Sequence, residues 1–270
     1  MSSLFEIRGD HFVPTEYSRG PWDPNHLHGG PSAALMTGAL ERIVGPEQAV
    51  SRVVVELMRP VPMEPLAVTA SEVRRGRKVS IVEASLSVVA TNVTVATARA
   101  TAVARQPTEP VDRTPALAGP ATAAPQWYPD PGESEVMAFH TQANEIRWES
   151  GQWRDLAGAR RQPVVVWFRL QVPMLARPID GSTVEPSPLQ RAVAAADFGN
   201  GVSAVLSWED HIFINSDVSV YLWRPPVGDW IGLRASTFVG PSGAAVAESE
   251  LFDQTGRFGR AVQTLLVEHR

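Results

Sequence analysis

The chain has 270 residues, of which 44% are hydrophobic and 20% charged, and its formal net charge is −5. This length allows one large domain or two of ordinary size, and the composition is that of a protein with a packed core. The negative charge argues against a nucleic-acid-binding protein, and the absence of cysteine excludes disulfides, thiolate catalysis and cysteine-ligated metal. The first ten residues lack the basic start and apolar run of a signal peptide, and no stretch of 18 apolar residues occurs. We therefore expect a cytoplasmic protein that does not insert into a membrane.

Two segments rich in small apolar residues are predicted to be helices. The first, Pro31 to Val44, opens with a proline suited to the first helical turn and is stopped by Gly45-Pro46. The second, Pro188 to Phe198, follows Ser187 and is closed by Gly199-Asn200-Gly201. Because their apolar residues are spread around the helix, both helices can be buried on nearly all sides.

The two sides of the chain resemble each other. A strand-like run from Val53 ends in Arg59-Pro60, and a similar run from Asp217 ends in Arg224-Pro225. Each is followed by a long stretch with β-branched residues at alternating positions, which is typical of antiparallel strands with one buried face. One helix followed by several long antiparallel strands, present twice, predicts an α+β protein with an internal duplication.

Between the two repeats lies a segment of linker composition. From Gln106 to Pro131 prolines recur every few residues and few large apolar side chains are present. We predict an N-terminal domain at 1–106, a Pro/Ala-rich linker at 107–137 and a C-terminal domain at 138–270.

A short motif directly before the first helix suggests a family. His28-Gly29-Gly30 resembles the His-Gly-Gly signature of hot-dog thioesterases. The doubled arrangement resembles the type II acyl-CoA thioesterases, which carry two hot-dog domains in one chain, and the likeness spans nearly the whole chain outside the linker. It implies two tandem hot-dog domains, each a long antiparallel sheet wrapped around a central helix, that form a pseudo-dimer. It also implies hydrolysis of acyl-CoA thioesters to free acid and CoA, in fatty acid metabolism.

The resemblance also implies three catalytic residues in the second half. Family members use an Asp of the central helix, a hydroxyl residue of the next strand and a Gln of the last strand to orient a water molecule against the thioester carbonyl. Asp197 and Gln263 match the first and third. The hydroxyl position falls on Asn215, a departure, although an amide can also donate and accept hydrogen bonds. Ser216 follows directly, but alternation along a strand points it to the other face.

The first half departs from the family pattern as well. Single-domain members place an acid nine residues after the His, where this chain has Thr37. One half thus lacks the acid and the other lacks the His-Gly-Gly, which fits one composite site per chain. In that site a carboxylate can act as general base. His28 and the Gly29-Gly30 turn, at a helix N-terminus with unpaired N–H groups, are predicted to bind substrate and the oxyanion.

Several alternatives remain open at this point. Asp23 and His28 are spaced as in hot-dog enoyl-CoA hydratases, where such a pair adds water across a double bond. Against this, His26 stands where the hydratases have proline, and His28 belongs to the Gly-Gly turn itself. The departures at Asn215 and Thr37 would instead suit a non-catalytic acyl-thioester binding protein. Structural roles are also open: Asp197 as a helix cap, Gln263 as a partner for a backbone group, and His28 as a support for the glycine turn.

The resemblance implies no metal and no organic cofactor. The expected partner is an acyl-CoA or acyl-carrier thioester substrate, with no nucleic acid. We expect a homo-oligomer, because a fused pair of domains still presents broad sheet or helix faces.

Overall fold

The computed structural model describes residues 2–111, 114–125, 137–151 and 163–270. The helices are α1 (Gly29–Val44), α2 (Pro188–Ala196) and α3 (Gly199–Ser203), with a 3₁₀ turn at Glu16–Ser18. The described strands are β1 (Phe5–Arg8), β2 (His11–Pro14), β3 (Gln48–Leu57), β4 (Leu66–Arg74), β5 (Val79–Val88), β6 (Val93–Ala104), β7 (Ala124–Pro125), β8 (Asn144–Ser150), β9 (Val164–Leu170), β10 (Leu175–Arg177), β11 (Ser182–Val184), β12 (His211–Asn215), β13 (Asp217–Leu222), β14 (Trp230–Val239), β15 (Ala244–Asp253) and β16 (Gly256–His269).

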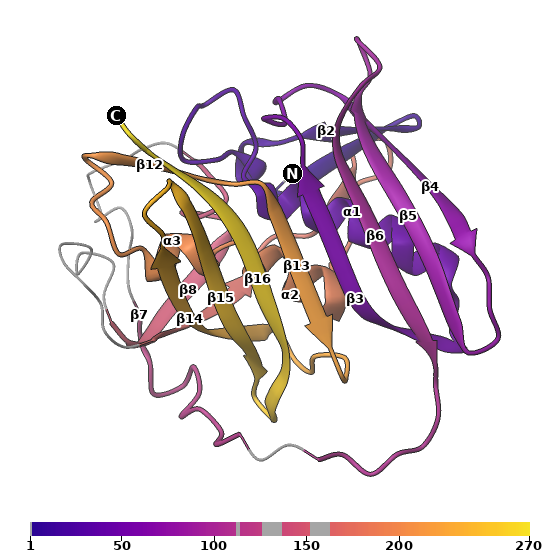
Figure 1. Cartoon of the computed structure of the whole chain (residues 1–270). Helices are drawn as coiled ribbons and strands as arrows, with labels where there is room; N and C mark the ends of the chain where they lie inside the picture. The colour runs from indigo at the N-terminus through magenta and orange to yellow at the C-terminus, as the bar shows by residue number, and fades with distance from the viewer. Residues whose placement is uncertain (1, 112–113, 126–136, 152–162) are drawn as a thin grey trace.

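The described strands form one continuous sheet that joins the two halves of the chain. Its order is β11-β10-β1-β2-β4-β5-β6-β3-β13-β16-β15-β14-β9-β8-β7, with β12 paired to β16. The halves meet where β3 and β13 run antiparallel side by side, with Val54 opposite Ser219 (Figure 1). Each half is a long antiparallel sheet around a central helix, so the predicted α+β pseudo-dimer of two hot-dog domains is confirmed.

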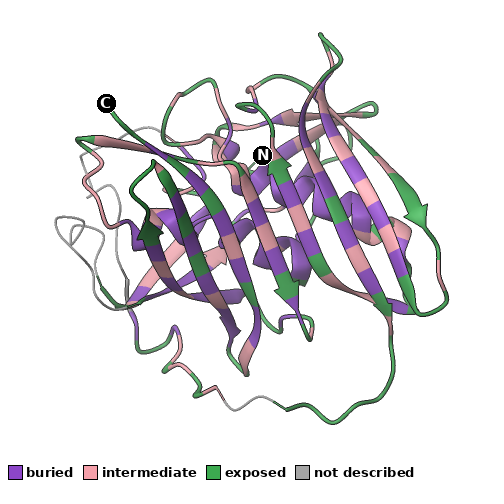
Figure 2. Ribbon diagram, viewed as in Figure 1, coloured by how far each residue is buried: buried purple, intermediate pink, exposed green. Residues whose placement is uncertain are grey.

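The strands alternate between a buried face toward the helices and an outer face toward solvent (Figure 2). In β5 every second residue from Ser80 to Val88 is buried, which is the two-residue period expected of a half-buried strand. Helix α1 lies behind β3, β4, β5 and β6 and also packs against α2. Because α1 faces both sheet and helix, its residues from Gly30 to Leu40 are buried without interruption.

The helices differ from the sequence prediction at two boundaries and by one additional short helix. Helix α1 begins at Gly29, two residues earlier than predicted, with His28 as its N-cap. It ends at Val44 as expected, and its C-cap is Gly45, whose φ of 76° favours glycine. Helix α2 ends at Ala196, and the glycine-rich Gly199-Asn200-Gly201 does not close it but begins α3, so that expectation was wrong. The reason is local. Asp197 and Phe198, which lie between the two helices, keep right-handed helical φ and ψ values, so the backbone continues from α2 into α3 with a short break.

The region predicted as a linker contacts the C-terminal half. Residues 112–113 and 126–136 of it lie outside the described residues. In the described part, β7 pairs with β8, and Leu117 and Ala123 pack on the outer side of the sheet against Trp167, Trp230 and Phe252. Glu149 fastens the same segment by accepting hydrogen bonds from the N–H groups of Ala118 (2.9 Å) and Gly119 (3.2 Å). The boundaries at 106 and 137 remain a prediction.

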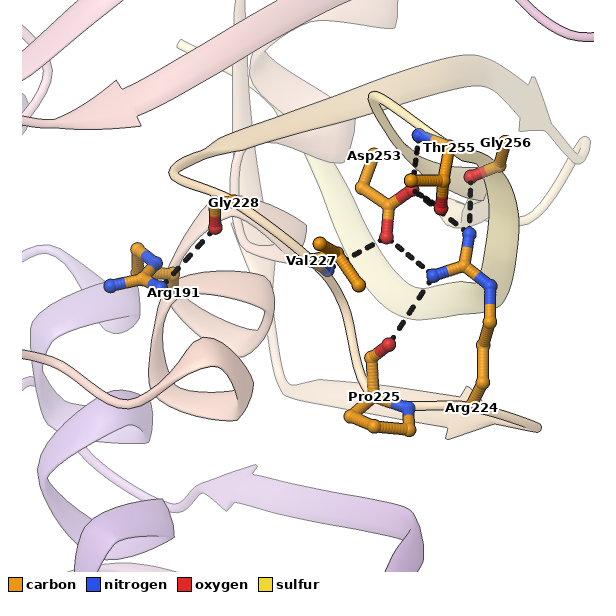
Figure 3. A network of polar contacts seen from close by, with 8 residues as sticks. All are labelled: Arg191, Arg224, Pro225, Val227, Gly228, Asp253, Thr255 and Gly256. Carbon is orange, nitrogen blue, oxygen red and sulfur yellow. Dashed lines mark hydrogen bonds and ion pairs between the residues drawn. The ribbon is translucent and has the colours of Figure 1, made fainter.

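A partly buried ion pair holds the corner that follows β13 (Figure 3). The Arg224 guanidinium donates to Asp253 at 2.9 Å and to the carbonyl of Gly256, while Asp253 also accepts from the N–H of Val227. Burial alone raises the pKa of Asp253, but the hydrogen bonds from Arg224, Thr255 and Val227 outweigh it and hold that pKa below its usual value. The second Arg-Pro pair therefore has a structural role, joining the end of β13 to the β15–β16 turn.

Candidate active site

The candidate site lies where the N-terminus of α1 meets the C-terminus of α2. His28 is the N-cap of α1, in the extended conformation usual for that position, and Asp197 is the C-cap of α2. The Nδ1 atom of His28 lies 2.6 Å from Oδ2 of Asp197. The side chain of Asp197 is 2% exposed and that of His28 13% exposed. The two halves of the chain thus each contribute one member of a nearly buried pair.

The short distance decides which nitrogen of His28 carries hydrogen. A contact of 2.6 Å between a ring nitrogen and a carboxylate oxygen needs a proton between them, so Nδ1 donates to Asp197. The N–H of Gly30 also points at Nδ1, at 3.2 Å, but that nitrogen then has no lone pair to offer it. In the neutral ring the other nitrogen, Nε2, is left as the acceptor.

Two amides donate to the other oxygen of Asp197. Nδ2 of Asn215, at the end of β12, lies 2.6 Å from Oδ1, and Nε2 of Gln263, on β16, lies 3.4 Å from it. Gln263 also donates to the main-chain oxygen of Asp197 at 3.2 Å. Its own Oε1 accepts from the N–H of Asn200 at 2.9 Å, which fixes the amide so that the NH₂ group faces Asp197. The carboxylate therefore receives donors on both oxygens, and its negative charge is stabilised although it is buried.

Glycine is required where α1 approaches α2. A Cβ on Gly29 would lie 2.8 Å and 2.9 Å from the two oxygens of Asp197, and one on Gly30 would lie 2.7 Å from the carbonyl of Ala194. A side chain on Gly29 would push the carboxylate away from His28, and one on Gly30 would push α2 away from α1. The Gly29-Gly30 pair thus allows the two halves to approach closely enough to form the site.

Aromatic rings form one wall of the site, and the sequence analysis missed them. The His28 ring lies 5.0 Å from Phe139 and 4.9 Å from Phe198, and Phe198 stacks on Phe168 at 4.5 Å. His140, next to Phe139, lies 6.5 Å from His28. Phe139 and His140 fall at the predicted linker–domain boundary, where no motif marks them, and only the folded chain brings them to His28.

The structure brings together all six residues predicted for the site. Asp197, Asn215 and Gln263 are joined by hydrogen bonds, His28 contacts Asp197, and Gly29 and Gly30 lie at the same helix end. Thr37, at the position where single-domain members have the acid, is buried and donates to the carbonyl of Ala33.

The Asp23–His28 pair of the hydratase alternative is not formed. Asp23 accepts from the N–H of Asn25 at 2.8 Å and lies 3.4 Å from His26, while His28 is engaged with Asp197. The surface loop therefore uses Asp23 for a local turn.

Comparison with known families identifies both halves of the chain. Residues 18–103 match the model of the acyl-CoA thioesterase N-terminal domain, and residues 114–267 match that of the C-terminal domain. The chain belongs to the acyl-CoA thioesterase family. The predicted membership is thereby confirmed, and so is the class of enzyme, a thioester hydrolase. No curated protein sequence matches the chain.

Solved structures confirm the thioesterase fold over the full length. The acyl-CoA thioesterase II TesB2 of Mycobacterium marinum is 17% identical with a TM-score of 0.67, covering 94% of this chain and 96% of its own. A hot-dog protein of Alicyclobacillus acidocaldarius is 18% identical with a TM-score of 0.69, covering 98% and 95%. The tesB protein of Mycobacterium avium subsp. paratuberculosis is 17% identical with a TM-score of 0.64, covering 98% and 96%.

Proposed function

We propose that this thioesterase hydrolyses acyl-CoA thioesters with a water molecule activated by the His28–Asp197 pair. The observation that carries the proposal is the 2.6 Å contact between Nδ1 of His28 and Oδ2 of Asp197. A carboxylate that holds Nδ1–H directs Nε2 toward the reactants as a base and stabilises the imidazolium formed when that nitrogen takes a proton. The more exposed member of the pair is the histidine, so the histidine is the one that water can reach.

The reaction then follows ordinary acyl-transfer chemistry. The water oxygen attacks the thioester carbonyl carbon while Nε2 of His28 takes its proton, and the carbonyl electrons move onto oxygen. When the tetrahedral intermediate collapses, the C–S bond breaks and the imidazolium returns the proton to sulfur, giving acid and thiol. The first N–H groups of α1, including that of Gly29, lie at the positive end of the helix dipole, where a developing oxyanion is stabilised.

Asn215 and Gln263 act in this proposal on the carboxylate. The resemblance predicted that they hold the water with Asp197 as its base. However, Gln263 is 1% exposed and its amide has protein partners at both ends. We therefore assign Gln263 and Asn215 to positioning Asp197. Direct action of Asp197 on water is the competing mechanism, and it predicts that activity survives replacement of His28.

The first experiment is thiol release from a panel of acyl-CoAs by the wild type, Asp197→Asn and Asp23→Asn. We expect release by the wild type, a loss of about 10³–10⁴-fold in kcat for Asp197→Asn, because an amide cannot stabilise the imidazolium, and no change for Asp23→Asn. Unchanged release by Asp197→Asn would discard this site. Water addition to an enoyl-CoA that depended on Asp23 would instead support the hydratase. Binding of acyl-CoA without turnover would support the non-catalytic acyl-thioester binding protein.

A homo-oligomer and a cytoplasmic location remain predictions from the sequence. In the part of the chain that the structure describes, no helix is long and apolar enough to cross a membrane. Sedimentation measures the assembly directly: a single species at 29.3 kDa, the mass of one chain, would contradict an oligomer.

A further inference from the structure

A second histidine, His140, lies beside the His28–Asp197 pair and has no part in the mechanism above. It belongs to a tight turn at residues 137–144 that hydrogen bonds hold in place. The N–H of Phe139 donates to the carbonyl of Arg19 at 3.0 Å, and Nδ2 of Asn144 donates to the carbonyl of Phe139 at 2.9 Å. Because Arg19 starts the loop that leads to His28, these hydrogen bonds fix the position of His140 relative to His28.

The separation of the two rings suits a shared oxygen atom. Their centroids are 6.5 Å apart with an interplanar angle of 32°. Two hydrogen bonds of about 2.8 Å to one oxygen place their nitrogens at most about 5.6 Å apart. The centroid separation is thus compatible with one oxygen atom, of water or of a thioester carbonyl, in contact with a nitrogen of each ring.

The environment keeps His140 uncharged. Burial, and then the positive charge that His28 can carry, lower the pKa of His140 to about 4. A neutral imidazole offers one N–H donor and one acceptor at every pH at which the enzyme would be assayed. Such a ring can polarise a carbonyl without competing with His28 for the proton of the attacking water.

The backbone of α1 leaves a need for such a donor. Pro31, in the first turn, has no N–H, so this turn has one donor fewer than an ordinary helix N-terminus. Catalysis of acyl transfer commonly uses more than one oxyanion donor, so a side-chain donor can add to the remaining N–H groups of α1.

We propose that His140 is a further catalytic residue, which donates a hydrogen bond to the thioester carbonyl oxygen as that oxygen becomes negatively charged. The step adds no new bond changes to the hydrolysis: water attacks carbon, His28 takes the proton, and the electron pair displaced onto the carbonyl oxygen is held by the N–H of His140. The inference rests on the proposed function, since it assigns a role within that reaction.

The test compares His140→Phe with His140→Gln, and His11→Phe is the matched control on β2. We expect His140→Phe to lower kcat for the best acyl-CoA by about 10²-fold, the usual effect of removing one oxyanion donor, with KM changed less than about threefold. His140→Gln, which keeps an N–H donor, should retain more kcat than His140→Phe, and His11→Phe should match the wild type. The melting temperature of each variant shows whether it is folded.

Two outcomes would overturn the role of His140. One is a folded His140→Phe enzyme with kcat within about threefold of the wild type, and the other is an equal loss of kcat in the Phe and Gln variants. The acidic limb of the kcat profile is a further readout. In the His140 variants this limb should lie at the same pH as in the wild type, because His140 is already neutral at assay pH. Loss of the limb in these variants would instead identify His140 as the base. Failure of the proposed function is separate, because it shows as absent wild-type turnover or an active Asp197→Asn.

Discussion

The contact between α1 and α2 has two ends, which the internal duplication makes equivalent in backbone. The side chains that meet at these two ends are of different types. At one end the N-cap of α1, His28, meets Asp197 at the end of α2. At the other end the N-cap of α2, Ser187, donates to Glu41 of α1 at 2.6 Å. At each end a polar side chain from α2 covers a glycine of α1: Asp197 lies over Gly29, and Gln190 lies over Gly38.

The difference lies in how those side chains are satisfied. Gln190 accepts from the N–H of Ser187 at 2.9 Å and donates to the carbonyl of Ala34 at 2.9 Å, so its amide joins the helices with both groups occupied. Asp197 is equally well bonded, but one of its partners is an imidazole with a second nitrogen. The same backbone geometry thus joins the two helices at one end and forms a candidate catalytic centre at the other. The difference depends on one side chain, His28.

The largest expected difference is between the two N-caps. His28→Ala removes the proposed base and should lower kcat by about 10³-fold, in the range of general-base catalysis. Ser187→Ala should leave turnover per folded molecule unchanged and lower the free energy of unfolding by about 1 kcal/mol, the usual effect of losing a capping hydroxyl. Thiol release and urea unfolding measure the two effects. Equal activity of both variants would show that the ends do not differ as proposed.

The two covered glycines should separate activity from stability. In Gly29→Ala the new Cβ would lie 2.8 Å from Oδ2 of Asp197, so the carboxylate must move, and we expect kcat/KM to fall by about 10–10²-fold. In Gly38→Ala the Cβ would press on Nε2 of Gln190, so this side chain should lose its hydrogen bonds, which lowers the free energy of unfolding by about 1–2 kcal/mol. Full activity in a folded Gly29→Ala enzyme would contradict the required position of Asp197.

Asn215 offers a finer test, because it donates to Asp197 from β12, outside the two helices. Asn215→Ala removes the 2.6 Å donor to Oδ1 of Asp197 and should lower kcat by about tenfold. Asn215→Thr restores a hydroxyl donor like that of the family pattern and should recover part of the loss. The assay is again thiol release at saturating acyl-CoA. A threonine variant no better than alanine would mean that the length of the asparagine side chain is needed.

The smallest effect is expected at Glu41. Burial raises its pKa more than the hydrogen bond from Ser187 and the charge of Arg42 lower it. A carboxyl whose pKa is raised by folding contributes stability at low pH and loses it as the pH rises through the folded pKa. Glu41→Gln should therefore raise the free energy of unfolding at pH 7, leave it unchanged below about pH 4, and not affect turnover. If Glu41→Gln stabilised the protein equally at every pH, the raised pKa of Glu41 would not be the cause.

Sequence reasoning worked best where a signal is local. The start of α2 at Pro188, the end of α1 at Gly45 and the alternation of the long strands follow from caps, glycine and a two-residue period. Asp197 and Gln263 could be named because the family motif fixes them along the chain.

What could not be predicted depends on how the halves dock. The pairing of His28 with Asp197, the approach of His140 and the placing of Gln190 over Gly38 each join residues more than 100 positions apart. The orientation of the Gln263 amide depends on one N–H of α3, a helix that the glycine-rich sequence had argued against. Long-range contacts of this kind are set by packing, which periodicity and motif spacing do not describe.

The junction of β3 with β13 also determines what cutting the chain would do. Because five consecutive residue pairs bind these strands, and β10 adds a parallel pairing to β1, main-chain hydrogen bonds hold the halves together independently of residues 107–137. A protease that cleaved within 107–111 would yield two fragments on a denaturing gel and one unseparated particle in native buffer. The covalent connection thus makes the halves meet at high effective concentration during folding, and the finished molecule no longer depends on it.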